Sequence, residues 1–185
     1  NGNLKEAKIL LKKILKILPN HLPSIFLLGT LLAQIQEYQT AIELLKQAIK
    51  IKPEFIAAHN NLGNAFQERG KYQEAMSCYQ RAIELNPEYA EAHNNFGNVF
   101  QELGKYQEAV SCYQRAIKLN PEYAEAQYNL GKVFQELGKN QEAVSAYQKV
   151  IQIDFKYIKA HNNLGNVLQE LRKNQEAVSC YQRAI

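Results

Sequence analysis

IAAHNNLGNAFQERGKYQEAMSCYQRAIELNPEY, residues 56–89, is followed directly by AEAHNNFGNVFQELGKYQEAVSCYQRAIKLNPEY, residues 90–123. These two 34-residue stretches differ at seven positions, and further copies of the pattern begin at residues 124 and 158. A fixed period of about 20 to 50 residues is typical of solenoids, whose units bury their apolar faces only by stacking on neighbours. The period therefore predicts a long surface that is presented to a partner.

Each unit contains two helical patterns of apolar residues. Ala58 and Leu62 belong to the first pattern and Ala75 and Tyr79 to the second, both at the spacing of a helix face. Gly70 lies between them, where a helix C-terminus favours a residue that tolerates positive φ. The unit is therefore predicted to be two antiparallel helices joined by a short turn, and the chain to be all-α.

Glycine also recurs in the middle of the first helix of each unit. Glycine inside a helix costs about 1 kcal/mol relative to alanine, because it gains conformational freedom on unfolding. A close approach of the second helix would offset this cost. We therefore expect tight helix contacts at Gly63, Gly97, Gly131 and Gly165.

The repeated residues resemble the tetratricopeptide repeat (TPR) family. The matching positions are Leu62-Gly63, Phe66, Ala75, Tyr79, Ala82 and Pro87, and a more divergent copy runs through Leu28-Gly29 and Pro53. Phe155 and Val150 depart from the pattern, standing where proline and alanine are expected. The resemblance implies an all-α, right-handed superhelical solenoid of antiparallel helix pairs.

The resemblance covers essentially the whole chain as a single array. Residues 22–55, 56–89, 90–123 and 124–157 are predicted to be full repeats, residues 1–21 the second helix of a truncated repeat, and residues 158–185 a truncated last repeat. The sequence thus resembles a fragment of a longer array. Apolar ends of this kind favour end-to-end homo-association.

Composition indicates which partners and compartments are compatible with the chain. The net charge is +4 and the hydrophobic content 46%, and no apolar run approaches the roughly 18 to 20 residues that span a bilayer. The repeated basic residues belong to turns and second helices rather than to a stripe with stacking aromatics. We therefore expect neither a nucleic-acid nor a membrane partner.

Cysteine and histidine follow the repeat as packing residues. Stacked units hold Cys78, Cys112 and Cys180 too far apart for disulfides, which favours a reducing, cytoplasmic compartment. One histidine per repeat does not converge on a metal ion; the residues are His59, His93 and His161. The sequence shows no phosphate loop, nucleophile elbow or carboxylate pair. We expect no enzymatic activity, metal or cofactor.

Asparagine forms a column on the first helices, which in the TPR family line the concave face. Because asparagine is a mediocre helix former, a column of it in mid-helix favours a binding role. A carboxamide matches the C=O and N–H of a peptide bond, whatever the peptide sequence. The predicted peptide-binding residues are Asn61, Asn95, Asn129 and Asn163, flanked by Asn60, Asn64, Asn94, Asn98, Tyr128, Lys132, Asn162 and Asn166.

The main functional hypothesis is a protein-interaction scaffold that binds an extended polypeptide along this column. Specificity is expected from neighbouring residues, including Gln67, Gln101, Gln135 and Gln169. A carboxylate clamp of the co-chaperone type is disfavoured, because Asn94 and Asn163 replace its lysine and arginine. One alternative is a substrate-docking arm, since the column resembles the repeat arm of O-linked N-acetylglucosamine transferases; self-assembly is another. The structural alternative is that duplication copied a solvated helix face.

Overall fold

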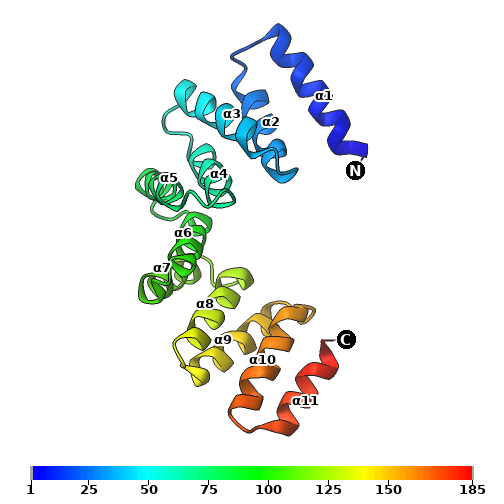
Figure 1. Cartoon of the computed structure of the whole chain (residues 1–185), viewed down its shortest axis with the longest axis vertical. Coiled ribbons are helices and arrows are strands. Elements are labelled where there is room, and N and C mark those ends of the chain that lie inside the picture. The colour runs from blue at the N-terminus through cyan, green and yellow to red at the C-terminus, as the bar shows by residue number, and fades with distance from the viewer. Residues whose placement is uncertain (1, 185) are drawn as a thin grey trace. The chain divides into compact units, whose positions relative to one another are not determined.

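The computed structural model describes residues 2–184, which contain eleven helices and no strand (Figure 1). They form two compact units, residues 1–88 and 89–185, each of which is described by itself. The helices of the first unit are α1 (Gly2–Ile17), α2 (Leu22–Gln34), α3 (Tyr38–Ile51), α4 (Ile56–Gln67) and α5 (Tyr72–Leu85). Those of the second unit are α6 (Ala90–Glu102), α7 (Tyr106–Leu119), α8 (Ala124–Glu136), α9 (Asn140–Ile153), α10 (Ile158–Glu170) and α11 (Asn174–Arg183).

The first unit consists of α1 and two helix pairs. Helices α2 and α3 form one pair and α4 and α5 the next, while α1 packs against α2 (Figure 1). Ile25, Leu32 and Leu45 lie completely inside this unit. None of residues 3–17 of α1 is buried, so this helix contributes one face to the packing and leaves the other exposed.

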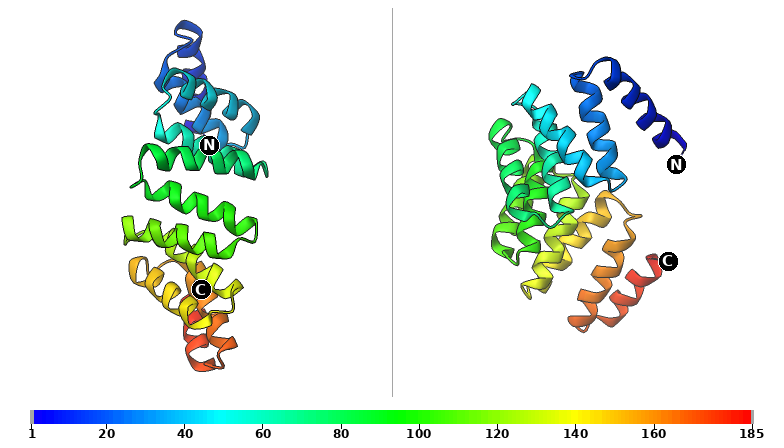
Figure 2. Two further views of the ribbon diagram at one scale, coloured as in Figure 1. Left: turned by 90° about the vertical axis from the view of Figure 1, so that its left-hand side faces the viewer. Right: turned by 45° about the horizontal axis from the view of Figure 1, so that its top comes forward.

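The second unit consists of three helix pairs, α6 with α7, α8 with α9 and α10 with α11 (Figure 2). Each second helix also packs on the first helix of the following pair. Tyr113 and Tyr147 are fully buried between the paired helices, with Val99, Val133 and Val167. The arrangement confirms the predicted class of fold, an all-α array of antiparallel helix pairs.

A residue with positive φ ends the first helix of each of the five pairs. Gly70, Gly104 and Gly138 have φ of 68°, 69° and 69°, as the sequence predicted. The amide of the next residue closes the turn, as in the bond from Lys105 N to Phe100 O at 2.8 Å. Gln36 and Arg172 adopt the same conformation at φ of 64° and 60° without being glycine.

The mid-helix glycines make the predicted close contacts. A Cβ placed on Gly63 would lie 2.6 Å from the Tyr79 ring, and one on Gly97 would lie 2.7 Å from the Tyr113 ring. Gly131 and Gly165 face Tyr147 and Tyr181 in the same way. Glycine therefore lets a tyrosine ring of the second helix lie directly on the backbone of the first.

Phe155 departs from the proline pattern without altering the turn between repeats. Asp154 Oδ1 accepts a hydrogen bond from Lys156 N at 2.9 Å. Asn86 and Asn120 make the equivalent bonds, at 3.0 Å and 3.2 Å, in the turns that contain proline. The side chain that precedes the proline site therefore supports the turn, and the register resumes in α10.

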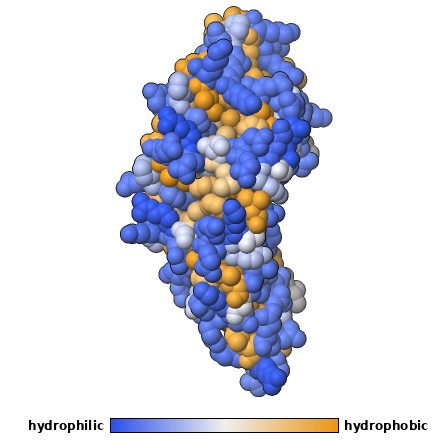
Figure 3. Space-filling model, turned by 60° about the vertical axis from the view of Figure 1, so that its left-hand side comes forward, coloured by the Kyte–Doolittle hydropathy of each residue, from blue (hydrophilic) through white to orange (hydrophobic). Residues whose placement is uncertain are grey.

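The exposed residues are mostly polar, as expected for stacked amphipathic helices. Figure 3 shows a face on which hydrophilic side chains surround smaller groups of hydrophobic ones. Among residues 2–184, no helix combines the length and the apolar character needed to cross a membrane. Cys78, Cys112 and Cys180 are half-buried free thiols.

Candidate functional site

The predicted binding residues lie on the first helix of four pairs, three residues to a helix. Helix α4 contributes Asn60, Asn61 and Asn64, and α6 contributes Asn94, Asn95 and Asn98. Helix α8 contributes Tyr128, Asn129 and Lys132, and α10 contributes Asn162, Asn163 and Asn166. The first three belong to the first unit and the other nine to the second.

These residues fall into three groups by burial. Asn60 and Asn94 have no exposed surface and Asn129 has 7%. Asn162 and Asn166 are exposed, and the others are half-buried. In the second unit Asn94 points toward the following repeat, where its Nδ2 lies 3.2 Å from Glu125 Oε1 of α8. Asn60 and Asn94 are thus packing residues in this structure, and the accessible part of the column consists of their neighbours.

Asn129 joins two repeats of the second unit. Its Nδ2 donates to Asn94 Oδ1 at 3.2 Å and to Asn98 Oδ1 at 3.1 Å, so that both amide protons bond to α6. A buried polar group is stable only when its hydrogen bonds are made. Part of the asparagine column is therefore a link between repeats, which sequence analysis did not predict.

Asn163 makes the corresponding link one repeat later. Its Nδ2 donates to the Tyr128 hydroxyl at 3.1 Å and to the Tyr147 hydroxyl at 3.3 Å. In the first unit Asn61 Nδ2 donates to Thr30 Oγ1 of α2 at 2.9 Å. Asn61, Asn129 and Asn163 thus direct their amide protons toward the preceding repeat, whether a hydroxyl or a carboxamide oxygen stands there.

The orientation of the Asn129 and Asn163 carboxamides leaves their oxygens available as hydrogen-bond acceptors. Both Nδ2 protons of Asn129 and Asn163 are used inside the second unit, and within the described residues neither Oδ1 has a hydrogen-bond donor. A carboxamide oxygen accepts up to two hydrogen bonds. These two oxygens can therefore accept from a peptide N–H without breaking any internal bond.

The glutamines of the first helices make hydrogen bonds that the sequence did not predict. The Tyr113 hydroxyl lies 2.8 Å from Asn98 Oδ1 and 3.0 Å from Gln101 Oε1. Tyr79 bonds Asn64 and Gln67 in the same way, and Tyr181 bonds Asn166 and Gln169. The side-chain oxygens of these glutamines therefore face the tyrosines of the second helices, while their expected contribution to specificity stays a prediction.

Helix α8 breaks this pattern, because Lys132 replaces the asparagine that bonds the tyrosine. The Tyr147 hydroxyl donates to Gln135 Oε1 and accepts from Asn163. Tyr128 lies beside it, with ring centroids 5.8 Å from Tyr147 and 5.2 Å from Tyr157. Burial raises the pKa of Tyr128, and the hydrogen bond from Asn163 only partly opposes this. The tyrosine is therefore a neutral hydroxyl at physiological pH.

The histidines lie in packing positions. His59 Nε2 donates to Pro53 O and His161 Nε2 to Phe155 O, each at 2.8 Å, and both rings are buried. His93 is half-buried. Across the part of the chain that the structure describes, no group of three His, Cys, Asp or Glu residues is placed to hold a metal ion.

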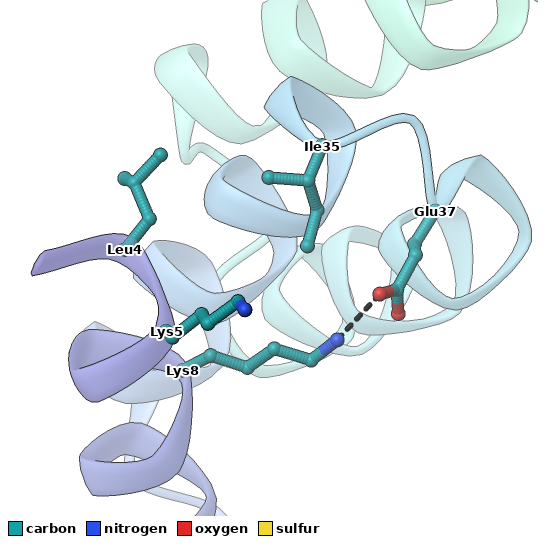
Figure 4. Close-up of a pocket in the computed structure, with 5 residues that line it drawn as sticks. All are labelled: Leu4, Lys5, Lys8, Ile35 and Glu37. Carbon is teal, nitrogen blue, oxygen red and sulfur yellow. Dashed lines mark hydrogen bonds and ion pairs between the residues drawn. The ribbon is translucent and has the colours of Figure 1, made fainter. Parts of the chain in front are cut away.

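The first unit has two hollows against α1 that the sequence did not predict. One is lined by Leu4, Lys5, Lys8, Ile35 and Glu37, and the Lys8 ammonium forms an ion pair with Glu37 beside it (Figure 4). The other, of about 440 Å³, is lined by Ala7, Leu10, Leu11, Leu27, Thr30, Leu31 and Gln34. Leu27, at the register of the asparagine column, is 53% exposed. The opposite wall is formed by α1, which lies within residues 1–21, predicted to be the second helix of a truncated repeat.

Solved structures with similar folds include TPR proteins. MamA is 28% identical, with a TM-score of 0.76 over 84% of this chain and 91% of that chain. YrrB, described as a TPR protein with an unusual peptide-binding site, is 22% identical, with a TM-score of 0.70 over 95% and 90%. PilF of Pseudomonas aeruginosa is 22% identical, with a TM-score of 0.83 over 98% and 77%. The likeness to YrrB and PilF shows the fold alone.

Sequence profiles identify the family. A profile described as TPR repeat matches residues 29–68, 63–104, 97–138 and 135–172, and one described as tetratricopeptide repeat matches residues 160–185. A comparison with curated proteins gives no match. Because the profiles cover most of the chain and its helix pairs have the corresponding architecture, the chain belongs to the tetratricopeptide repeat family.

Proposed function

We propose that the second unit binds an extended polypeptide across α6, α8 and α10, as a protein-interaction scaffold. The observation that carries this proposal is the orientation of Asn129 and Asn163. Each holds both amide protons inside the protein and leaves its Oδ1 without a donor. An acceptor fixed in this way loses little freedom when a peptide N–H binds to it, which reduces the cost of association.

The surface around these two acceptors is polar and accessible. Asn162 and Asn166 are exposed on α10, and Asn95 and Asn98 are half-buried on α6. Neighbouring packed helices are about 8 to 10 Å apart, and an extended chain rises about 3.3 Å per residue. If each first helix offers one acceptor, successive acceptors would therefore contact residues of a bound chain that are roughly three or more positions apart. The peptide-binding site named in the description of YrrB agrees with a binding role for such a face.

The first unit has a shorter version of the same face. Asn61 is held by Thr30 in the way that Asn163 is held by Tyr128, and Asn64 bonds the buried Tyr79. Helix α2 presents Leu27 instead of asparagine at this register, beside the hollow against α1. We expect this part of the face to accept an apolar side chain rather than a peptide backbone.

Affinity is expected to be modest. A net gain of about 0.5 to 1.5 kcal/mol per hydrogen bond amounts to a few kcal/mol over the available acceptors. The ordering of the peptide opposes this gain. We therefore expect micromolar or weaker binding, which suits a surface that combines many weak contacts.

A library of disordered peptides, passed over the immobilised protein, tests the proposal. The variants Asn129→Ala and Asn163→Ala remove one acceptor each, and their helicity is checked by circular dichroism. Each is expected to weaken binding about fivefold, since one hydrogen bond contributes roughly 1 kcal/mol. Asn174→Ala, an exposed asparagine on α11, is the matched control. Unchanged binding by the two folded acceptor variants would show that the peptides use another face.

Self-association is a second candidate, supported by the exposed apolar side chains of α1. Leu10 is 59% and Ile17 is 79% exposed. Concentration-dependent light scattering of the protein and of Leu10→Lys would show whether this helix joins molecules. If scattering shows a monomer throughout, the candidate fails.

The substrate-docking alternative stays a prediction, tested by whether deletion of these repeats abolishes glycosyl transfer by an enzyme that contains them.

A further inference from the structure

Helix α8 differs from the other first helices at two positions of the proposed binding face. Tyr128 stands at the register of Asn60, Asn94 and Asn162, and Lys132 at the register of Asn64, Asn98 and Asn166. The two residues are one helical turn apart and therefore lie on the same side of α8. At these two positions, α8 thus has an aromatic ring and a cation where the other three first helices have two carboxamides.

Lys132 forms no ion pair with any residue that the structure describes. Its Nζ lies 5.9 Å from the centroid of the Tyr128 ring, a cation–π arrangement. Within residues 2–184, the ion pairs involve other lysines and an arginine. Glu136, one turn further along α8, forms no ion pair with Lys132 although the spacing permits one. Lys132 occupies a half-buried position, and an ammonium without a carboxylate partner gains from any anion that reaches it.

The ring beneath the ammonium is held in place. Its hydroxyl accepts the hydrogen bond from Asn163 Nδ2 at 3.1 Å, and it packs against Tyr147 and Tyr157. Asn129, with its available Oδ1, is the residue after Tyr128 on the same helix. The cation is therefore positioned beside an acceptor proposed to bind the peptide backbone.

We propose that Lys132, positioned over Tyr128, selects bound polypeptides that carry an aspartate or glutamate side chain where they cross α8. The carboxylate accepts a charge-assisted hydrogen bond from Nζ, which is stronger than a bond between neutral groups. The neighbouring backbone N–H donates to Asn129 Oδ1. This proposal rests on the proposed function, and it adds a sequence preference to a face of carboxamides that would otherwise bind any backbone.

The test uses a library of acetylated, amidated peptides randomised among alanine, serine, leucine, glutamine and glutamate. Amidation removes the terminal carboxylate, so a retained preference belongs to a side chain. The variant Lys132→Asn introduces the residue that three other repeats carry at this register, where it bonds the tyrosine of the second helix. This variant is therefore expected to fold, and Lys149→Asn on the exposed face of α9 is the control.

We expect glutamate to be enriched over glutamine about tenfold at one peptide position, as for one charge-assisted hydrogen bond. The enrichment should fall as salt is added, persist in Lys149→Asn and disappear in Lys132→Asn, which still retains glutamine peptides. Retained peptides without a glutamate preference would overturn the inference and leave the proposed function standing. A preference seen only with free C-termini would also overturn it. If no peptide is retained, the proposed function fails as well.

Discussion

At the scale of single residues, the contact between glycine and tyrosine decides how closely the paired helices approach. In each of four pairs a glycine lies where any side chain would meet a tyrosine ring within 3.0 Å. The ring has little room to move, since Tyr79, Tyr113 and Tyr147 are fully buried. The cost of glycine in a helix is thus offset by a contact that only glycine permits.

This contact predicts an unusual response to a glycine-to-alanine substitution. In most helices the change stabilises by up to about 1 kcal/mol, but Gly97→Ala is expected to destabilise by about 1 to 3 kcal/mol through overpacking against Tyr113. Denaturant unfolding measures the change. In a Tyr113→Leu background the ring is absent, and the same substitution should be neutral or stabilising. Destabilisation of equal size in both backgrounds would show that the ring is not the cause.

At the scale of helices, carboxamides link successive repeats of the second unit. Asn129 of α8 bonds Asn94 and Asn98 of α6, and Asn163 of α10 bonds Tyr128 of α8. These bonds join the first helices of neighbouring pairs, which otherwise meet mainly through the second helix between them. The asparagine column therefore has a structural role beside its proposed one in binding.

Replacement of Asn129 by alanine tests the structural role. The change removes the donor to the buried Asn94 Oδ1, whereas Asn98 Oδ1 keeps the Tyr113 hydroxyl, and we expect a loss of about 1 to 3 kcal/mol in the free energy of unfolding. Asn162→Ala, on an exposed position of α10, should change it by less than about 0.5 kcal/mol. Denaturant unfolding of both variants checks the difference. Equal effects would contradict the link between α6 and α8.

Local stability is expected to differ between helices of the same unit. Helix α1 has no buried residue between positions 3 and 17, and α11 has only Ala177 among its described residues. By contrast, α2 and α9 bury five or more residues each. Because amide exchange follows local opening, we expect amides of α1 to exchange faster than those of α2, and those of α11 faster than those of α9. Hydrogen exchange measured by mass spectrometry checks both pairs, and uniform protection would contradict the prediction.

At the scale of the whole molecule, stability should fall in alkaline solution. Burial raises the pKa of Cys78 and of Cys112 from the usual 9.0 to about 11, and it raises the pKa of Tyr113 and Tyr147 above 10.0. A raised pKa means that the folded chain holds its proton more tightly than the unfolded chain. The resulting stabilisation is complete below about pH 9 and is lost as the pH rises through 11.

Unfolding in denaturant at a series of pH values measures this loss. The double variant Cys78→Ala and Cys112→Ala is a matched control, because Ala146 occupies the same register in α9. We expect its stability to fall less steeply between pH 9 and 11, while the contribution of the tyrosines remains at higher pH. Identical pH profiles would show that these thiols do not take part.

Sequence alone determined the repeat and its local structure. The apolar spacing predicted the helix pairs, Gly70 and its equivalents the turns, and the mid-helix glycines the close contacts, all of which the structure confirms. These features depend on residues within one 34-residue unit, where helix periodicity and turn chemistry operate. The predicted repeat boundaries are compatible with the helix bounds and stay a prediction.

Tertiary structure decided what the side chains of the column do. Asn129 and Asn163 lie at one register of the repeat, yet one bonds carboxamides and the other tyrosine hydroxyls. The glutamines expected on the binding face bond buried tyrosines, and Asp154 supports the turn where proline is missing. Each outcome depends on which atoms a neighbouring helix or turn brings within hydrogen-bond distance. Periodicity places a residue on a face, whereas only the packed neighbours determine which of its atoms remain available to a ligand.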